Sequence, residues 1–252
     1  MIVLATYNLK GGVGKTAAAV NLSYLASLGG HKTLLWDLDP QGAASFYYRI
    51  EPTAAKDPNT LLDRKRGLAA AVRGTNYLGL DIIPADFGYR NLDVALSEFR
   101  KPTTRLGKLL APLAEDYDLA FADCAPHLSL ASENVFDMAD WLLVPVIPTP
   151  LAVRAYAQLR EFCERGKLTS KKLLPFFSMV DGRRQLHRDL VTQFAKEHPE
   201  VLRSFIPYTS QVEKMGEQRA PVPTFAPTSP GARAFGALWG VICERIDLVD
   251  LA

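Results

Sequence analysis

An apolar run from Ile2 to Ala5 leads into the glycine-rich segment Lys10-Gly11-Gly12-Val13-Gly14-Lys15-Thr16. This order of strand, glycine-rich turn and helix constrains the fold most, because glycine lets backbone N–H groups and the positive end of a helix surround a polyphosphate. The spacing predicts that Lys15 contacts the β- and γ-phosphates and that the Thr16 hydroxyl binds Mg²⁺. The backbone from Lys10 to Ala17 is therefore the predicted nucleotide-binding loop.

The loop carries a second lysine, Lys10, upstream of the usual Lys15. The standard pattern has a glycine five positions before Gly14, where this chain has Leu9, so the loop is a deviant form. Because one lysine already serves the phosphates, Lys10 has no clear task within its own chain. It is available to reach a phosphate from outside, across a dimer interface. The alternative is a solvated loop lysine.

Three aspartates follow apolar runs further along the chain. Asp37 and Asp39 stand two residues apart, and alternate residues of an extended segment point the same way, so the two carboxylates share a face. Asp123 ends the apolar run from Leu119 to Ala122, where a carboxylate can bind Mg²⁺ through a water beside Thr16. The alternative for Asp123 is an ordinary turn residue.

Three segments, in this order, resemble the motifs of the ParA/MinD family of deviant Walker ATPases. They are the loop Lys10 to Thr16, the segment Leu34-Leu35-Trp36-Asp37-Leu38-Asp39-Pro40-Gln41-Gly42 and the strand Tyr117-Asp118-Leu119-Ala120-Phe121-Ala122-Asp123-Cys124-Ala125-Pro126. The second resembles the acidic motif of the family and the third its Walker B strand. The Asp-Pro-Gln-Gly ending resembles the DNA- and cargo-partitioning branch more than the membrane branch.

The resemblance implies an ATPase that uses ATP and Mg²⁺ and forms a nucleotide-sandwich dimer, in which Lys10 crosses to the partner's ATP. It also implies that Asp39 orients or activates the attacking water, whereas Asp37 supports the shell of Mg²⁺ and Thr16. Lys10, Lys15 and Asp39 are thus the expected catalytic residues. A ParB-like or cargo-adaptor protein that stimulates hydrolysis is the expected partner.

The chain has 252 residues, of which 48% are hydrophobic, and we expect one P-loop domain over residues 1–252. Apolar runs alternate with helical stretches, which predicts an α/β fold with a mostly parallel, twisted sheet flanked by helices on both faces. Ligands of such a sheet lie at the carboxyl ends of its strands. The expected strands are Ile2–Ala5, Thr33–Trp36, Leu80–Ile83, Leu119–Ala122, Trp141–Ile147, Leu173–Phe177 and Ser204–Ile206.

Other segments are predicted from their local signals. Thr149 and Pro150 predict a helix that runs through Phe162, with a capping hydroxyl and then proline at the first helical position. A last helix is expected near residues 232–245. Residues 51–66, with two prolines and mixed charge, predict a surface excursion.

The C-terminal half carries the predicted DNA and base contacts. The formal net charge of +2 is too small for the whole surface to attract nucleic acid, so a DNA contact must come from a local patch. Clustered cations suit non-specific contact with phosphates, and the alternative is a solvated basic face. The resemblance favours nucleoid DNA as partner, and it places the adenine contacts in the segment from Pro207 to Gln211. The candidate DNA-binding residues are Lys171, Lys172, Arg183, Arg184 and Arg188.

The expected location is the cytoplasm, in association with the nucleoid. Cys124, Cys163 and Cys243 are few and widely spaced, which predicts neither a disulfide framework nor a metal knuckle. The first predicted strand starts at Ile2, which leaves no room for a signal peptide. The ending from Glu244 to Ala252 has three acidic residues and one arginine, so no membrane partner is expected.

Two alternative functions stay open. One is a MinD-like, membrane-associated positioning ATPase, which would need a basic amphipathic helix at the C-terminus. The other is an ATP-dependent metabolic enzyme of the dethiobiotin synthetase type, which shares the loop and the sheet but has no use for Lys10 as a cross-dimer residue. Turnover of a small molecule without stimulation by DNA would favour the enzyme.

Overall fold

The computed structural model describes residues 1–51, 62, 68–165 and 172–249. Over these residues the strands form one eight-stranded sheet in the order β3-β4-β2-β5-β1-β6-β7-β8. Neighbouring strands pair in parallel, except that β3 runs antiparallel to β4 at the edge. The strands are β1 (Ile2–Thr6), β2 (Thr33–Asp37), β3 (Arg73–Gly74), β4 (Leu80–Ile83), β5 (Leu119–Asp123), β6 (Trp141–Val146), β7 (Lys172–Val180) and β8 (Phe205–Pro207).

Helices connect the strands. The α-helices are α1 (Lys15–Leu28), α2 (Ala43–Tyr47), α4 (Leu92–Ser97), α5 (Arg105–Leu110), α6 (Leu130–Met138), α7 (Pro150–Arg165), α8 (Gln185–Glu197), α9 (Ser210–Glu213), α10 (Met215–Gln218), α11 (Val222–Phe225) and α12 (Pro230–Ile246). Short 3₁₀ helices lie at Leu68–Ala71, Phe87–Asn91, Pro102–Thr104 and Ala111–Glu115.

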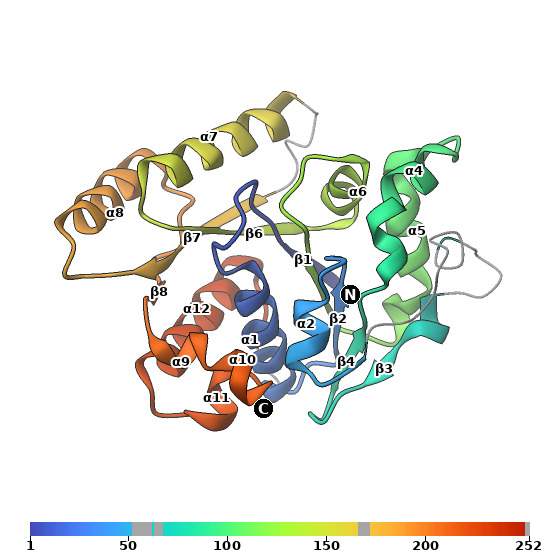
Figure 1. Ribbon diagram of the computed structural model, residues 1–252, viewed down its shortest axis with the longest axis horizontal. Helices are drawn as coiled ribbons and strands as arrows, with labels where there is room; N and C mark the ends of the chain where they lie inside the picture. Colours follow the sequence, from blue (N-terminus) through green and yellow to red (C-terminus); the bar gives the residue numbers. More distant parts are fainter. Residues whose placement is uncertain (52–61, 63–67, 166–171, 250–252) are drawn as a thin grey trace.

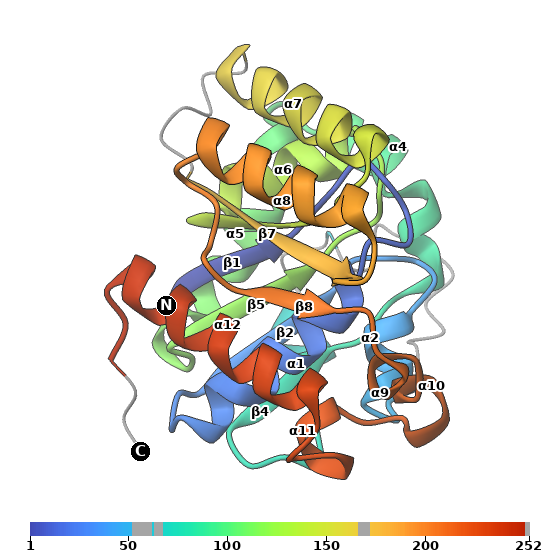
Figure 2. The ribbon, with the colours of Figure 1, turned by 90° about the vertical axis from the view of Figure 1, so that its left-hand side faces the viewer.

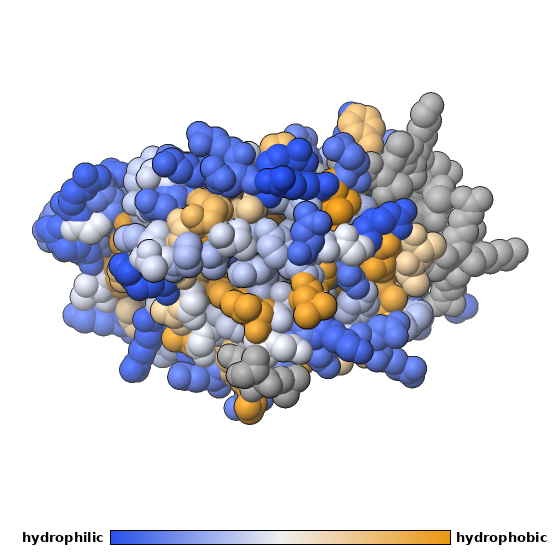
Figure 3. Space-filling view, turned by 90° about the horizontal axis from the view of Figure 1, so that it is seen from below, coloured by the Kyte–Doolittle hydropathy of each residue, from blue (hydrophilic) through white to orange (hydrophobic). Residues whose placement is uncertain are grey.

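The helices cover both faces of the sheet. Helices α4 to α8 lie on its upper side and α1, α2 and α9 to α12 on its lower side (Figure 1), and the view at right angles shows the same three layers (Figure 2). Seen from below, the outer surface of the lower layer carries small groups of apolar side chains among polar ones (Figure 3), as is usual for a solvent-facing layer.

Burial on both faces explains why the strands read as unbroken apolar runs. In β2, Trp36 packs in the upper core, where its indole N–H donates to the Tyr89 hydroxyl at 3.2 Å, whereas Leu35 packs in the lower core. In β5, Phe121 faces the lower core against Trp239, with ring centroids 6.1 Å apart. Successive residues thus enter opposite cores, so these strands have no exposed face on which polar residues would alternate with apolar ones.

The predicted fold class is confirmed, and each of the seven predicted strands is present. Strand β3 was missed because its two residues, Arg73 and Gly74, carry no apolar pattern. The helix predicted after Thr149 begins at Pro150, but the capping role of the Thr149 hydroxyl is wrong. That hydroxyl is buried without a hydrogen-bond partner among the described residues, and the Thr149 carbonyl instead accepts from the N–H groups of Ala152 and Val153. The excursion predicted at 51–66 lies outside the described residues, apart from 51 and 62.

Candidate nucleotide site

The three motifs meet at one edge of the sheet because their strands are neighbours. Strands β2, β5 and β1 stand side by side, and each leads at its carboxyl end into one of the motifs. In the register of the sheet, Asp123 lies opposite Thr6 of β1 on one side and opposite Asp37 of β2 on the other. The strand order therefore brings together carboxylates that are 86 residues apart in the chain.

The glycine-rich loop is held in shape from both sides. The Asn8 side chain donates to the Pro145 carbonyl at 2.8 Å and accepts from the Lys10 backbone N–H at 2.9 Å. Gly12 and Gly14 have φ of +69° and +94°, which disfavour other residues, and a Cβ on Gly14 would lie 2.8 Å from the Ser178 hydroxyl oxygen. The loop is thus a fixed turn of N–H groups at the start of α1, as a polyphosphate site requires.

The two lysines of the loop have different surroundings. Lys15 is only 7% exposed; burial lowers the pKa of its ammonium, against the opposing charges of Asp123 and Asp39. Lys10 is half-buried, and its ammonium makes no hydrogen bond or ion pair with any residue that the structure describes. Lys15 thus belongs to the carboxylate cluster of its own chain, whereas the Lys10 ammonium does not.

Asp123 has the properties of a metal ligand. It is fully buried, and one of its oxygens accepts from the Thr6 hydroxyl at 3.2 Å. The other oxygen, Oδ2, is buried with no hydrogen-bond partner in the described part of the chain. Burial is the main cause that raises the pKa of Asp123, followed by the charge of Asp37, while the Thr16 hydroxyl lowers it. An orphaned carboxylate oxygen beside a hydroxyl is a donor set that fits Mg²⁺.

Asp37 is bonded mainly to α2. Its Oδ2 accepts from the Ser45 backbone N–H at 2.8 Å and from the Ser45 hydroxyl at 2.7 Å, and its Oδ1 accepts from the Asp39 N–H at 3.3 Å. The Ser45 oxygen also accepts from the Ala85 N–H at 2.9 Å. Burial raises the pKa of Asp37 more than these hydrogen bonds lower it. Sequence reasoning missed Ser45, because nothing in the sequence indicates that the helix after Gly42 returns this hydroxyl to Asp37.

Asp39 sits in a tight turn beyond the end of β2. Its Oδ1 accepts from the Gln41 N–H at 2.9 Å, and its carbonyl accepts from the Gly42 N–H at 2.9 Å. The Asp39 side chain is half-buried, and its negative charge raises the pKa of Lys15, against the effect of burial. The structure thus places Asp39 at the rim of the cluster, where a carboxylate remains accessible to water.

A cavity of about 60 Å³ adjoins the loop on the lower side of the sheet. Three of the predicted nucleotide residues, Gly14, Ala17 and Pro207, line it. A carboxylate also lines this cavity, that of Glu213, which accepts from the Tyr208 hydroxyl at 2.9 Å. The cavity is lined by Gly14, Ala17, Ala18, Phe176, Ser178, Met179, Ile206, Pro207, Tyr208, Thr209, Val212, Glu213 and Phe235. Its position next to the phosphate loop and its apolar walls make this cavity, the base cavity, the candidate site for the nucleotide base.

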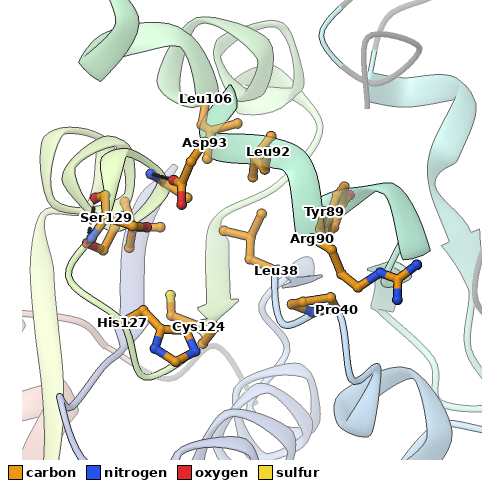
Figure 4. Close-up of a pocket in the computed structure, with 14 residues that line it drawn as sticks. Leu38, Pro40, Tyr89, Arg90, Leu92, Asp93, Leu106, Cys124, His127 and Ser129 are labelled. Atoms are coloured by element: carbon orange, nitrogen blue, oxygen red, sulfur yellow. Dashed lines mark hydrogen bonds between the residues drawn. The ribbon is translucent and has the colours of Figure 1, made fainter. Parts of the chain in front are cut away.

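A larger cavity, of about 310 Å³, lies on the upper side of the sheet beside the acidic motifs (Figure 4). Leu38 and Cys124, which directly follow the predicted metal ligands Asp37 of β2 and Asp123 of β5, form part of its wall. Asp93 points into the cavity, while its Oδ1 accepts from the Ala131 N–H at 2.7 Å; the Arg90 guanidinium points away (Figure 4). The segments that follow β2 and β5 thus line this cavity.

The predicted basic cluster lies elsewhere. Helix α8 packs beside α7 near the β8 end of the sheet (Figures 1 and 2), and Arg184 precedes it. The Arg183 side chain is paired with Asp181, at 2.9 Å and 3.0 Å, and Arg188 donates to the Gly182 carbonyl at 2.6 Å. Arg183 lowers the pKa of Asp181 through these hydrogen bonds. Of the three arginines, only Arg184 has a side chain without a hydrogen bond or ion pair to the described residues.

Of the two lysines predicted for this cluster, Lys171 lies outside the described residues, and Lys172 is the first residue of β7. Over the described chain, no helix is long and apolar enough to cross a membrane, and no group of three or more His, Cys, Asp or Glu side chains is arranged to hold a metal ion.

Known proteins that are similar to this chain in sequence or fold include a partitioning ATPase and a structure solved with bound nucleotide. The "Chromosome-partitioning ATPase Soj" of Treponema pallidum is 28% identical over 96% of this chain and 97% of its own. Cobyrinic acid a,c-diamide synthase from Mycobacterium smegmatis, solved with bound ADP and magnesium, has a TM-score of 0.82 and 26% identity over 98% of this chain and 96% of its own. Apo McdA from Cyanthece shares the fold, with a TM-score of 0.83 and 22% identity over 96% of this chain and 99% of its own.

A protein-family model described as an AAA domain matches residues 1–175, which include β1, β2 and β5 with all three motifs. This match spans more than half of the chain. The chain therefore belongs to this AAA-domain family, as a Walker ATPase of the ParA/MinD type.

Proposed function

We propose that this protein is a partitioning or positioning ATPase. It binds ATP and Mg²⁺, closes into a nucleotide-sandwich homodimer, and binds nucleoid DNA without sequence preference while it carries a cargo. A ParB-like or cargo-adaptor protein stimulates hydrolysis and so releases the dimer from DNA. The protein acts in the cytoplasm, on the nucleoid, and the 252 residues work as one P-loop domain.

The observation that carries this proposal is the contrast between the two lysines. Lys15 is buried against Asp123 and Asp39, so one cation already serves the phosphates of the same chain. The Lys10 ammonium is only half-buried and has no bonded partner among the described residues, although its backbone is fixed by Asn8. A fixed backbone with an uncommitted ammonium at the rim of a phosphate site suits a contact with the nucleotide of a second molecule.

The residues divide the chemistry by position. The loop from Lys10 to Thr16 would bind the phosphates, and Thr16 and Asp123, supported by Asp37, would hold Mg²⁺. When bound, the metal ion neutralises charge on the phosphates. Asp39 stands at the rim, where it accepts a proton from, or orients, the attacking water. Lys15 and Lys10 stabilise the charge on the transferred phosphoryl group, which is the main requirement of this reaction.

Two substitutions test the proposal. Lys15→Ala is expected to weaken nucleotide binding itself, whereas Lys10→Ala is expected to bind nucleotide but fail to dimerise. A nucleotide titration paired with light scattering, in the presence of ADP, ATP or neither, separates the two effects. Normal ATP-dependent dimerisation of Lys10→Ala would show that the cross-dimer role is wrong.

A second candidate function is favoured by the 310 Å³ cavity beside Leu38 and Cys124, which is large enough for a small substrate. In that case the protein would be an ATP-dependent enzyme that activates a small molecule, and a relative named cobyrinic acid a,c-diamide synthase shares its fold and 26% of its sequence. The two candidates differ in their response to DNA. Stimulation of ATP turnover by duplex DNA and a partner favours partitioning; turnover that depends on a small molecule favours the enzyme.

A further inference from the structure

A basic hollow of about 390 Å³ lies between α4 and α5. Its wall consists of one aromatic ring and four cationic side chains, and no acidic residue lines it over the described chain. The lining residues are Phe99, Arg100, Lys101, Arg105 and Lys108. Four cations in one hollow are a strong local concentration of charge in a chain whose net charge is +2.

Two of the cations are placed by α5. Arg105 and Lys108 stand three residues apart on this helix and therefore point to the same side. The Arg105 guanidinium lies 4.3 Å from the centre of the Phe99 ring and donates to the Leu62 carbonyl, which fixes its position. Arg100 and Lys101 come from the connection after α4 and complete the hollow.

Three of the four cations in this hollow are less compensated than Arg183 near α8. Arg183 is paired with Asp181, whereas Arg100, Lys101 and Lys108 are exposed and make no hydrogen bond or ion pair with any described residue. Uncompensated cations release more counterions from a polyanion than cations that already have a carboxylate partner.

We infer that the basic hollow is a second contact with the DNA backbone, at the opposite end of the sheet from α8. This inference rests on the proposed function, because it names a further surface for the same partner. In Figure 1, α4 and α5 lie at the right and α8 at the left, so the two basic regions flank the nucleotide site. Two weak contacts on one rigid body bind a long polyanion more tightly than either contact alone.

The hollow suits DNA better than an anionic membrane. Membrane-surface sites combine cations with apolar side chains that enter the lipid. Among the residues that line the hollow, the only large apolar group is the Phe99 ring, which is half-buried and covered by the Arg105 guanidinium. The hollow therefore offers charge without an apolar anchor.

The test is a triple variant, Arg100→Ala, Lys101→Ala and Lys108→Ala, which leaves Arg105 and its contacts intact. The matched control removes three exposed cations from other parts of the surface, with Lys32→Ala, Arg233→Ala and Arg245→Ala. Affinity for two unrelated duplexes is measured with ATP over a salt series, together with dimerisation and binding to vesicles that contain anionic lipid. We expect the hollow variant to dimerise normally and to lose about tenfold or more in affinity for both duplexes. The slope of log K against log salt should become shallower by about 2 to 3, at 0.9 for each phosphate contact.

The control variant is expected to bind DNA nearly as the wild type does. Equal affinity and slope in the hollow variant and the wild type would overturn this inference, while leaving the proposed function in place. Loss of vesicle binding with unchanged DNA binding would also overturn it, and would assign the hollow to a membrane. A wild-type protein that binds neither duplex with ATP would overturn both this inference and the proposed function.

Discussion

Arg49 and Arg219 hold each other's segments together. Arg49 donates to the Arg219 carbonyl at 3.3 Å and to the Gln218 carbonyl at 2.9 Å, and Arg219 donates back to the Phe46 carbonyl at 3.1 Å. The Arg219 guanidinium also lies 4.5 Å from the centre of the Phe46 ring. This pair, the arginine clasp, joins the end of α2, the helix that carries Ser45, to the end of α10.

Replacing Arg219 with glycine should slow turnover with little loss of stability. Arg219 has a φ of +47°, so glycine removes a backbone cost of about 1–2 kcal/mol, which offsets the loss of a hydrogen bond worth about 1 kcal/mol. Arg219→Gly leaves the two Arg49 hydrogen bonds, which go to backbone carbonyls, but removes the hydrogen bond and the ring contact to Phe46, so α2 and the Ser45–Asp37 contact are less firmly placed. We expect kcat to fall several-fold at a similar KM for ATP, with Arg219→Lys between glycine and wild type and Arg233→Ala as control. An unchanged kcat in Arg219→Gly would remove the clasp from the mechanism.

Asp39→Ala is expected to retain ATP binding and to trap the dimer, because the phosphate loop survives while the water loses its carboxylate. Turnover should fall by about 10²-fold or more, the usual contribution of a general base. Asp39→Asn keeps an oxygen for the Gln41 N–H and so controls for the turn. Wild-type hydrolysis in either variant would show that Asp39 has no chemical role.

The effect of Mg²⁺ on stability should grow with pH. Burial raises the pKa values of Asp37 and Asp123 in the folded protein, so the folded state keeps protons that the unfolded chain has released. Without metal, stability therefore falls as pH rises from the ordinary carboxyl pKa through these raised values, by about 1.4 kcal/mol for each unit of pKa shift. Mg²⁺ binds the ionised carboxylates and reverses this loss.

Melting temperatures at pH 5 and pH 8, with and without Mg²⁺ and ADP, measure this linkage. The Mg²⁺-dependent increase should be larger at pH 8 in the wild type, and Asp123→Asn should reduce the difference between the two pH values. An equal increase at both pH values in the wild type would contradict the assignment of Asp123 to the metal.

The arginines near α8 should contribute unequally to DNA binding. Arg184 has no bonded partner among the described residues, whereas Asp181 already pairs with Arg183. We expect Arg184→Ala to weaken DNA binding more than Arg183→Ala, and Asp181→Asn to strengthen it by freeing Arg183. Mobility shifts at one salt concentration rank the three variants. A larger loss in Arg183→Ala would show that DNA displaces Asp181 from its partner.

The sequence predicts the sheet and the carboxylate cluster well, because both depend on local signals. A strand buried on both faces must be apolar throughout, and parallel strands place their carboxyl ends together, so Asp37 and Asp123 meet at one edge. The contacts between distant segments are not predictable in this way. Ser45 bonds to Asp37 only because α2 turns back over β2, and nothing in the sequence around Arg49 indicates a partner 170 residues away.

The pairing of the basic residues is not predictable from the sequence for the same reason. A run such as Arg183 to Arg188 is visible in the sequence, but its neutralisation by Asp181 depends on side-chain geometry. The four cations of the hollow also stand close together in the sequence, between Arg100 and Lys108, but the contact of Arg105 with the Phe99 ring is visible only in the structure. Counting charges along the chain therefore finds both clusters and does not show which of their cations have partners.

The division of the nucleotide site along the chain has a consequence for how such proteins diverge. The phosphate loop and the carboxylates lie within residues 1–175, whereas most walls of the base cavity, from Phe176 to Phe235, lie beyond them. Under the proposed function, we therefore expect substitutions in the C-terminal stretch to alter the choice between ATP and another nucleoside triphosphate without touching the phosphate loop or the carboxylates.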